Sequence, residues 1–331
     1  MPACPTPPPR KSSAMSTATP SRTAARTPGT RPPTNPRAPR KRAGIFGGRM
    51  TPWLFLIVPL AFLIVLTYVP VANMFWYSVT SWDGLDEEKE FVGLANYIEI
   101  FTRPELFQVF FVSLYYLAGA IAQLVIALFF ATLLSFKTRF RNLFKGIIFF
   151  PYLINGVAIG LMFLYFFRPD GTLDALLAAL GVTDTPQWLG DSSVVNSSLA
   201  ATSVWRYMGL NFVLFLGAIQ SVPVEQYEAA DLDGANSWHK FRFIIVPSIR
   251  RILGLSFILA IAGALSAFEM PYIMTGGANG SETFVIQTVD TAFRFAKVGL
   301  ASAMAVVLLV IVLVITAVQR AFFPDEKKGL S

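Results

Sequence analysis

Six long apolar segments limit the folds that are open to this chain. They run over about 53–77, 109–135, 146–167, 195–220, 253–274 and 299–322. Each is close to the roughly 20 residues that an α-helix needs to cross the hydrocarbon core of a bilayer. Only 14% of the residues are charged, whereas soluble domains carry roughly a quarter. The sequence therefore predicts an all-α, polytopic membrane protein with six transmembrane helices.

Prolines interrupt some of these segments. Pro59 and Pro70 lie within the first one, and Pro271 lies near the end of the fifth. Proline lacks the N–H group that a helix interior uses, so we expect kinks or helix ends at these positions. Neighbouring helices would satisfy the carbonyl groups that are set free.

The charges of the connections predict the orientation in the membrane. Residues 1–50 hold ten basic residues and no acidic one, and 136–145 holds four basic residues and no acidic one. Acidic residues outnumber basic ones by seven to two in 78–108 and by four to one in 168–194. Because basic connections stay in the cytoplasm, both termini and the fourth connection, 221–252, are predicted to be cytoplasmic.

The first 45 residues differ in composition from the rest. They are rich in Pro, Thr, Ser, Ala and Arg, and such a stretch buries too little apolar area to offset its ordering entropy. We expect a disordered basic tail over 1–45, followed by a six-span domain over 46–331. The excess positive charge belongs to this tail, so no nucleic-acid partner is expected. A topogenic role is favoured over binding to membrane lipid or to a protein.

The fourth connection, 221–252, has the composition of two short helices. Pro223 suits a first helical turn, and Glu225 and Glu228 place negative charge near the positive end of the helix. Gly234 suits a left-handed stop.

A second helix is expected after this stop. Ser237 is its expected cap, and Pro247 is expected to end it after Val246. Ala229 and Ala230 give the first helix a small, flat surface on which another protein could pack.

The spacing of residues in this connection resembles a family signature. The EAA signature of ABC importer permeases is matched by Glu228, Ala229, Ala230, Gly234, Ile244 and Pro247, with Val246 in place of the usual Leu. The resemblance implies that the connection is a coupling helix, which docks on a cytoplasmic ATPase. Glu228 would contact polar or basic residues of that ATPase, the two alanines would allow close approach, and Gly234 would make the turn.

Shorter elements resemble the maltose-type, carbohydrate-importing branch of these permeases. They are Phe91–Tyr97, Asp233–Asn236 and Met274–Gly277. The resemblance implies a multi-pass subunit of the bacterial plasma (inner) membrane that imports a sugar and forms half of the pathway. It also implies a second, homologous permease subunit in a heterodimer, two cytoplasmic ATP-binding subunits and an extracellular or periplasmic sugar-binding protein.

Catalytic chemistry has little support in this sequence. No Gly-x4-Gly-Lys-Ser/Thr sequence occurs, so the ATP site would belong to another subunit. Cys4 is the single cysteine and His239 the single histidine. We therefore expect no catalytic residue, no metal site and no cofactor.

Two ionisable residues fall inside predicted spans. Arg206 lies midway along the fourth span and Glu269 late in the fifth, where an unpaired charge costs at least about 2.5 kcal/mol. They are candidates to line the substrate path, with Trp205, Tyr207 and Asn211 supplying stacking and hydrogen bonds. A structural charge pair is the alternative, equally open for Arg206 and favoured for Glu269.

Three other functions are weaker alternatives. A secondary transporter usually has more spans with internal repeats. An ABC permease for a non-sugar solute would share the EAA signature, so only the shorter elements argue against it. A membrane enzyme would need a catalytic cluster that one histidine does not supply.

Overall fold

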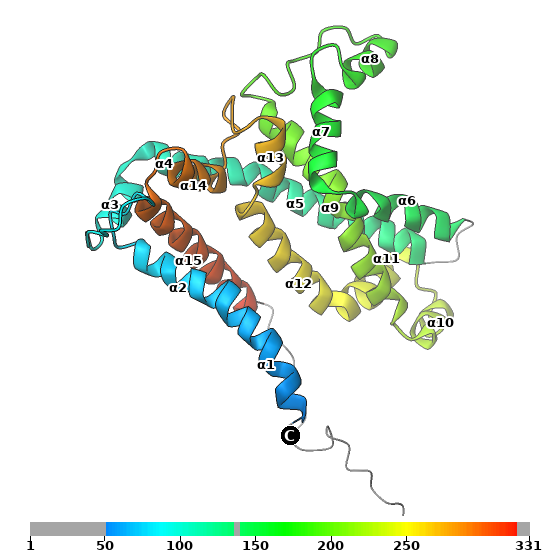
Figure 1. Ribbon diagram of the computed structural model, residues 1–331. Helices are drawn as coiled ribbons and strands as arrows, with labels where there is room; N and C mark the ends of the chain where they lie inside the picture. The colour runs from blue at the N-terminus through cyan, green and yellow to red at the C-terminus, as the bar shows by residue number, and fades with distance from the viewer. Residues whose placement is uncertain (1–50, 136–139, 323–331) are drawn as a thin grey trace, which may run out of the picture. The chain divides into compact units, whose positions relative to one another are not determined.

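The computed structural model describes residues 51–135 and 140–322 (Figure 1). The predicted tail, 1–45, lies outside them. In this part of the chain the secondary structure is helical, apart from one isolated antiparallel bridge between Thr80 and Phe91. The described residues from Pro59 onward pack together as one compact unit. All packing described below lies within that unit.

The α-helices include the long apolar segments and several shorter ones. They are α1 (Thr51–Leu63), α2 (Val69–Tyr77), α3 (Ala95–Thr102), α4 (Pro104–Gln108), α5 (Val112–Ser135), α6 (Arg141–Leu153), α7 (Gly156–Phe167), α8 (Thr172–Ala179), α9 (Val195–Gln220), α10 (Val224–Leu232), α11 (Ser237–Lys240), α12 (Val246–Leu265), α13 (Glu269–Met274), α14 (Phe284–Phe293) and α15 (Val298–Phe322).

Five helical stretches of the described residues are long and apolar enough to cross a membrane. They are Phe55–Tyr77, Pro104–Ser135, Val195–Gln220, Ser237–Met274 and Val298–Ala321. The third predicted span, 146–167, is instead a bent pair in which α6 and α7 meet at 96°. Counting that pair as one span gives the six that the sequence predicts.

The break between α6 and α7 has a local cause. Ile154 and Asn155 adopt extended backbone angles, with ψ near 140°, and end the hydrogen-bonding ladder of α6. Asn155 then caps α7, because its side-chain oxygen accepts a hydrogen bond from the Val157 N–H at 2.8 Å. Pro151 in the last turn of α6 removes one further donor. The predicted span 146–167 is therefore broken after Leu153.

Helices α5 and α9 form the centre of the packed unit, where they lie side by side (Figure 1). Small residues of α5 allow this close approach, since Ala127 and Ala131 are fully buried. Phe212 and Phe215 of α9 are fully buried in the same cluster. Helix α12 packs against both α5 and α9, so the three helices can enclose a common space.

Two prolines are accommodated by widened helical turns. A π-helical turn over Ile64–Tyr68 precedes Pro70, and another over Phe241–Ile245 precedes Pro247. A wide turn shifts the hydrogen-bond partners by one residue, so the proline ring fits without ending the helix. Pro247 therefore does not end a helix, contrary to the sequence expectation, and the chain is helical on both sides of it.

The element Phe91–Tyr97 holds the end of the first span. The Asn96 side-chain amide donates hydrogen bonds to the carbonyl oxygens of Ser78 at 2.9 Å and Thr80 at 2.8 Å. The Tyr97 hydroxyl donates to the Ser78 hydroxyl at 2.8 Å. The two bonds from Asn96 satisfy carbonyl groups that the end of α2 leaves free.

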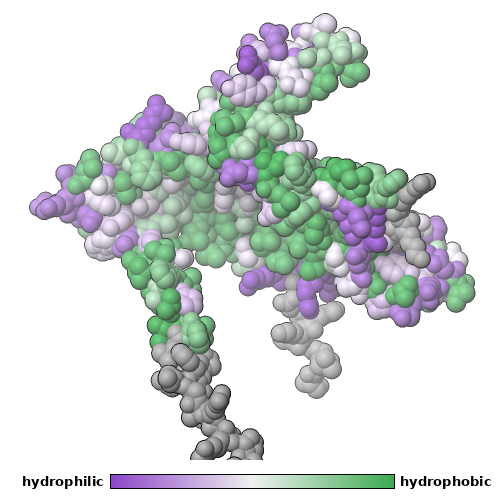
Figure 2. Space-filling view, turned by 45° about the vertical axis from the view of Figure 1, so that its right-hand side comes forward, coloured by the Kyte–Doolittle hydropathy of each residue, from purple (hydrophilic) through white to green (hydrophobic). Residues whose placement is uncertain are grey.

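The surface agrees with a membrane environment. Figure 2 shows hydrophobic residues over the long helices and hydrophilic residues gathered mainly at their ends. Large apolar side chains such as Phe62, Leu66 and Phe129 are exposed. A large apolar surface of this kind fits lipid or another membrane subunit.

Candidate functional site

Residues 223–247, here called the two-helix arm, form the first candidate site. Pro223 caps α10, Glu225 lies in its first turn, and no residue of α10 is buried. Leu232 is 91% exposed. An exposed helix that presents large apolar side chains is typical of a surface that another protein covers.

The end of α10 is a Schellman turn. The Gly234 N–H donates to the Asp231 carbonyl at 3.1 Å, and the Ala235 N–H donates to the Ala230 carbonyl at 2.9 Å. Gly234 has a φ of +73°, a conformation that glycine adopts without steric cost. The sequence prediction of a left-handed stop at this residue is confirmed.

The second part of the arm differs from the sequence prediction. Asn236, not Ser237, caps α11, because its side-chain oxygen accepts a hydrogen bond from the His239 N–H at 2.9 Å. The helix continues into the fifth span through the π-helical turn. An ion pair between Lys240 and Asp231 connects α11 to α10. The arm is therefore attached directly to a membrane-spanning helix.

The residues of the EAA-like pattern do not all occupy one place. Ala230, Gly234 and Ile244 line a shared surface hollow of about 340 Å³. Glu228 and Ala229 are exposed on α10, outside this hollow. The first two residues are therefore exposed on α10, whereas the other three face the hollow between the two parts of the arm.

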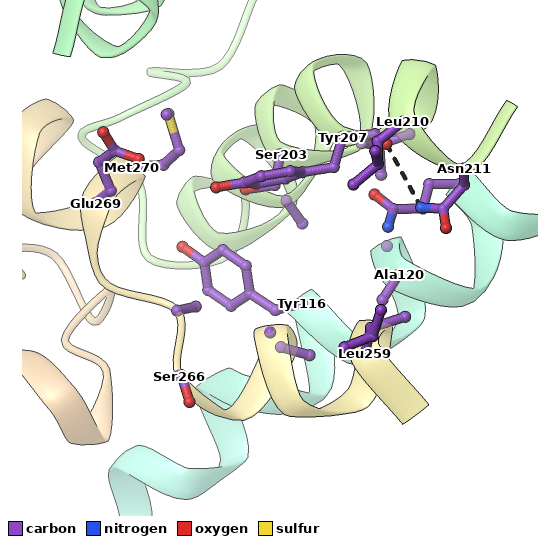
Figure 3. A pocket seen from close by; sticks show the side chains of 18 of the residues that line it. Tyr116, Ala120, Ser203, Tyr207, Leu210, Asn211, Leu259, Ser266, Glu269 and Met270 are labelled. Carbon is purple, nitrogen blue, oxygen red and sulfur yellow. Dashed lines mark hydrogen bonds between the residues drawn. The ribbon is translucent and has the colours of Figure 1, made fainter. Parts of the chain in front are cut away.

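The second candidate site is a cavity of about 400 Å³ between α5, α9, α12 and the start of α13, here called the central cavity (Figure 3). Most of its wall is apolar or small. Its polar side chains are those of Tyr116, Gln123, Ser203, Tyr207, Asn211, Ser256, Ser266 and Glu269. A mostly apolar wall with a few polar groups is the usual composition of a small-molecule site.

An ion pair lies at one end of the central cavity. Arg206 of α9 pairs with Glu269 of α13. Gly156, at the start of α7, is buried beside this pair, and a Cβ atom at this position would overlap both charged groups. The pair thus lies where the third span is broken and where α12 gives way to α13. The partner of each charge is the other one, as the structural interpretation proposed.

The five candidate residues for the substrate path occupy different places. Tyr207, Asn211 and Glu269 line the central cavity, whereas Trp205 and Arg206 are not among its lining residues. Trp205 packs against Phe163, with ring centroids 5.2 Å apart. Arg206 lies behind Glu269, with its side chain 13% exposed.

Tyr116 is a cavity residue that the sequence reasoning missed. It is 5% exposed, and its hydroxyl has no hydrogen-bond partner among the described residues. Its hydroxyl points toward the Glu269 and Met270 end of the cavity, as does that of Tyr207 (Figure 3). Tyr116 belongs to the buried stripe of α5, with Ala120 and Gln123 at helical spacing. The helical spacing of this stripe was the sequence signal that could have identified Tyr116.

Acidic residues in the connections have shifted pKa values. The indole N–H of Trp188 donates to Asp174 at 2.8 Å and holds the pKa of that carboxyl below its ordinary value. Backbone N–H groups of Asp86 and Leu85 lower the pKa of Asp83. Burial and the nearby charge of Asp290 raise the pKa of Glu282. These groups order the connections between spans.

The long apolar helices define a multi-pass membrane protein, and an ion pair joins two of its spans. Residues 123–328 match the model of the family described as binding-protein-dependent transport system inner membrane component. The chain belongs to this family of ABC transporter permeases. It is therefore a multi-pass inner-membrane subunit of an ABC importer, and the ATPase is a separate component.

Relatives agree over most of the chain. It is 34% identical to the "Probable ABC transporter permease protein YurN" of Bacillus subtilis, over 85% of this chain and 98% of that protein. It is 30% identical to the multiple sugar-binding transport system permease protein MsmF of Streptococcus mutans, over 81% and 93%.

A solved structure supports the fold. In the crystal structure of a bacterial alginate ABC transporter, in complex with an alginate pentasaccharide-bound periplasmic protein, one chain matches with a TM-score of 0.74 at 16% identity. The match covers 83% of this chain and 94% of that one.

Proposed function

We propose that this chain is one of two permease subunits of an ATP-driven carbohydrate importer, in which it forms half of the pathway and receives the ATPase on its two-helix arm. The observation that carries the proposal is the arm itself. Its exposed helix α10 carries the first three residues of the EAA-like pattern, and α11 continues into the fifth span without a break at Pro247. A rigid connection of this kind transmits movement from a cytoplasmic subunit to a membrane helix.

Three features support a role of the arm in coupling. Glu228 and Ala229 are exposed, the turn at Gly234 is closed by two backbone hydrogen bonds, and an ion pair joins the two helices. Leu232 and Trp238 add exposed apolar area at the same end of the arm. Such side chains are common at the core of protein interfaces.

The carbohydrate assignment is supported by the central cavity and by the relatives. Saccharides offer many hydroxyl groups and apolar ring faces, and the cavity offers hydroxyl, amide and carboxylate groups beside the aromatic rings of Tyr116, Tyr207 and Phe268. Relatives such as MsmF are named for sugar transport. An uncharged non-sugar solute is the second candidate, since the cavity would also accept other small polar molecules.

The assembly follows from this proposal. The other side of the pathway would come from a homologous permease, in a heterodimer. Two ATP-binding subunits would occupy the cytoplasmic face, and an extracellular or periplasmic binding protein would deliver the sugar. Both termini and the two-helix arm would be cytoplasmic, which the basic residues Arg141 and Lys145 next to α5 support.

Uptake by the complete transporter, reconstituted with its binding protein, tests this function. Glu228→Lys reverses a charge on exposed α10, so we expect sugar uptake and binding-protein-stimulated ATP hydrolysis to fall at least about tenfold. Glu88→Lys makes the same change at an exposed residue of the connection 78–94 and serves as the control. Undiminished uptake by Glu228→Lys would contradict the coupling role. Uptake of only non-sugar solutes by the unaltered transporter would contradict the carbohydrate assignment.

A further inference from the structure

The two members of the central ion pair have unequal access to the central cavity. Glu269 lines the cavity and its side chain is 39% exposed, whereas Arg206 is not a lining residue and its side chain is 13% exposed. Of the two, only Glu269 contributes to the cavity wall, and its carboxylate pairs with the guanidinium group of Arg206. Gly156 leaves room for this arrangement, because a side chain there would overlap both groups.

Glu269 determines the sign of the charge that an entering solute meets. No other charged side chain occurs among the described residues that line the cavity. The rest of the wall is neutral and mostly apolar, so it screens this charge less than bulk water does. A solute in the cavity therefore meets a hydrogen-bond acceptor that carries negative charge.

Neutral hydroxyl groups complete the polar end of the cavity. The Tyr116 hydroxyl has no partner among the described residues, and it points toward the same end as Glu269 (Figure 3). A buried hydroxyl without a partner costs free energy until a ligand supplies one. A carboxylate that accepts hydrogen bonds from hydroxyl groups, beside a tyrosine hydroxyl that donates or accepts them, is complementary to an uncharged polyol.

We propose that Glu269 is a specificity-determining residue of the pathway. Its carboxylate accepts hydrogen bonds from the hydroxyl groups of an uncharged saccharide and repels anionic saccharides such as uronates, while Arg206 acts as its positioning residue. This inference rests on the proposed function and narrows its substrate class. Removal of the Glu269 charge leaves Arg206 as the nearest charge behind the cavity wall. The preference should then reverse in favour of anions.

The charge preference is measurable without knowledge of the sugar. Ser203 lines the cavity on α9, one turn from Arg206 and Tyr207. In the assembled transporter, Ser203→Cys on a Cys4→Ser background provides a single thiol in this chain. The rates of its modification by a cationic and by an anionic methanethiosulfonate reagent would be compared. A thiol on exposed Leu85 corrects for the different intrinsic rates of the two reagents.

We expect the cationic reagent to be favoured while Glu269 is present. Glu269→Gln should move the cation-to-anion ratio by about tenfold or more toward the anion, since one unit charge is lost at short range. Glu269→Asp should keep the original preference. The double variant Arg206→Gln/Glu269→Gln contains no unpaired charge and should give a cation-to-anion ratio near one. It replaces Glu269→Gln in the experiment if that single variant does not assemble. Glu88→Gln removes an equal charge outside the cavity and should change nothing.

Two outcomes would overturn the inference. One is a ratio that does not respond to Glu269→Gln or to the double variant. The other is a thiol at position 203 that neither reagent modifies, which would mean that solutes do not enter the cavity. Sugar uptake by the unaltered transporter is measured separately. Normal ATP-driven uptake with an unresponsive ratio would contradict the role of Glu269 alone, whereas absent uptake would contradict the proposed function.

Discussion

Arg206 in the middle of α9 and Glu269 at the start of α13 form an ion pair that connects a continuous span to an interrupted one. The same pair lies against Gly156, where the third span is broken. Three spans thus meet at a single charged contact inside an apolar bundle. Substitutions at this contact should therefore change the stability of the subunit.

Removal of one partner should destabilise the subunit. Arg206→Leu leaves the Glu269 carboxylate without its partner, and breaking a fully buried pair costs about 3–5 kcal/mol. Glu269 is partly exposed, so we expect a loss of about 2 kcal/mol. Thermal unfolding of the purified subunit in detergent measures this change. Arg206→Leu/Glu269→Leu should recover part of the loss, and a double variant less stable than Arg206→Leu would contradict the pairing.

The fit of Gly156 provides a second prediction. Gly156→Ala places a methyl group where the ion pair lies, so the pair must move, and we expect a loss of about 1–3 kcal/mol. Gly217→Ala is the matched control, because nothing lies within 4 Å of a Cβ atom at this position of α9. That variant should be unchanged or more stable by up to ~1 kcal/mol. Equal melting temperatures of the two variants would argue against close packing at Gly156.

The connection after the first span should depend on Asn96. Asn96→Ala leaves the carbonyl groups of Ser78 and Thr80 without their donor, at a cost of about 1–3 kcal/mol. Tyr97→Phe removes one hydroxyl bond and should cost less. Limited proteolysis between α2 and α3 would follow local opening. Cleavage of Asn96→Ala no faster than that of Tyr97→Phe would contradict the role given to the amide.

Much of the fold followed from sequence, but the breaks in the spans did not. Six apolar segments predicted the spans because hydrophobic length is a property of local sequence. The 96° bend between α6 and α7 depends on the backbone of Ile154 and on the cap formed by Asn155. Asn is a preferred N-cap residue, but here it lies inside a continuous apolar segment, which hides that signal. The prediction for Pro247 was wrong because a π-helical turn before it lets the helix continue, and no residue pattern in the local sequence predicts that turn.

The candidate sites divide in the same way. The stop at Gly234 was predictable because a left-handed residue strongly favours glycine. The pairing of Arg206 with Glu269 depends on contact between residues 63 positions apart in sequence, so sequence could only pose it as an alternative. Tyr116 was overlooked although it shares a helix face with Ala120 and Gln123, and the packing then shows that its ring is buried whereas that of Tyr115 is exposed.

Acid should weaken the connection around α8. The hydrogen bond from Trp188 lowers the pKa of Asp174 in the folded state, so the ionised carboxyl stabilises the fold at neutral pH. This contribution is present above the unfolded pKa of about 3.9 and is lost as the pH falls through the lower folded value. As the pH is lowered from 7 to 3, the melting temperature of Asp174→Asn should fall less steeply than that of the unaltered protein. Parallel curves would contradict the role of this carboxyl.

The side of the membrane on which the two-helix arm lies tests the account most directly. Leu232→Cys on a Cys4→Ser background places a single thiol at the most exposed part of α10, and Leu85→Cys places one at an exposed position of the connection 78–94. A membrane-impermeant maleimide should label position 85 in intact cells and position 232 only in inverted vesicles, where added ATPase subunit should slow the reaction. Labelling of position 232 from outside intact cells would contradict the account.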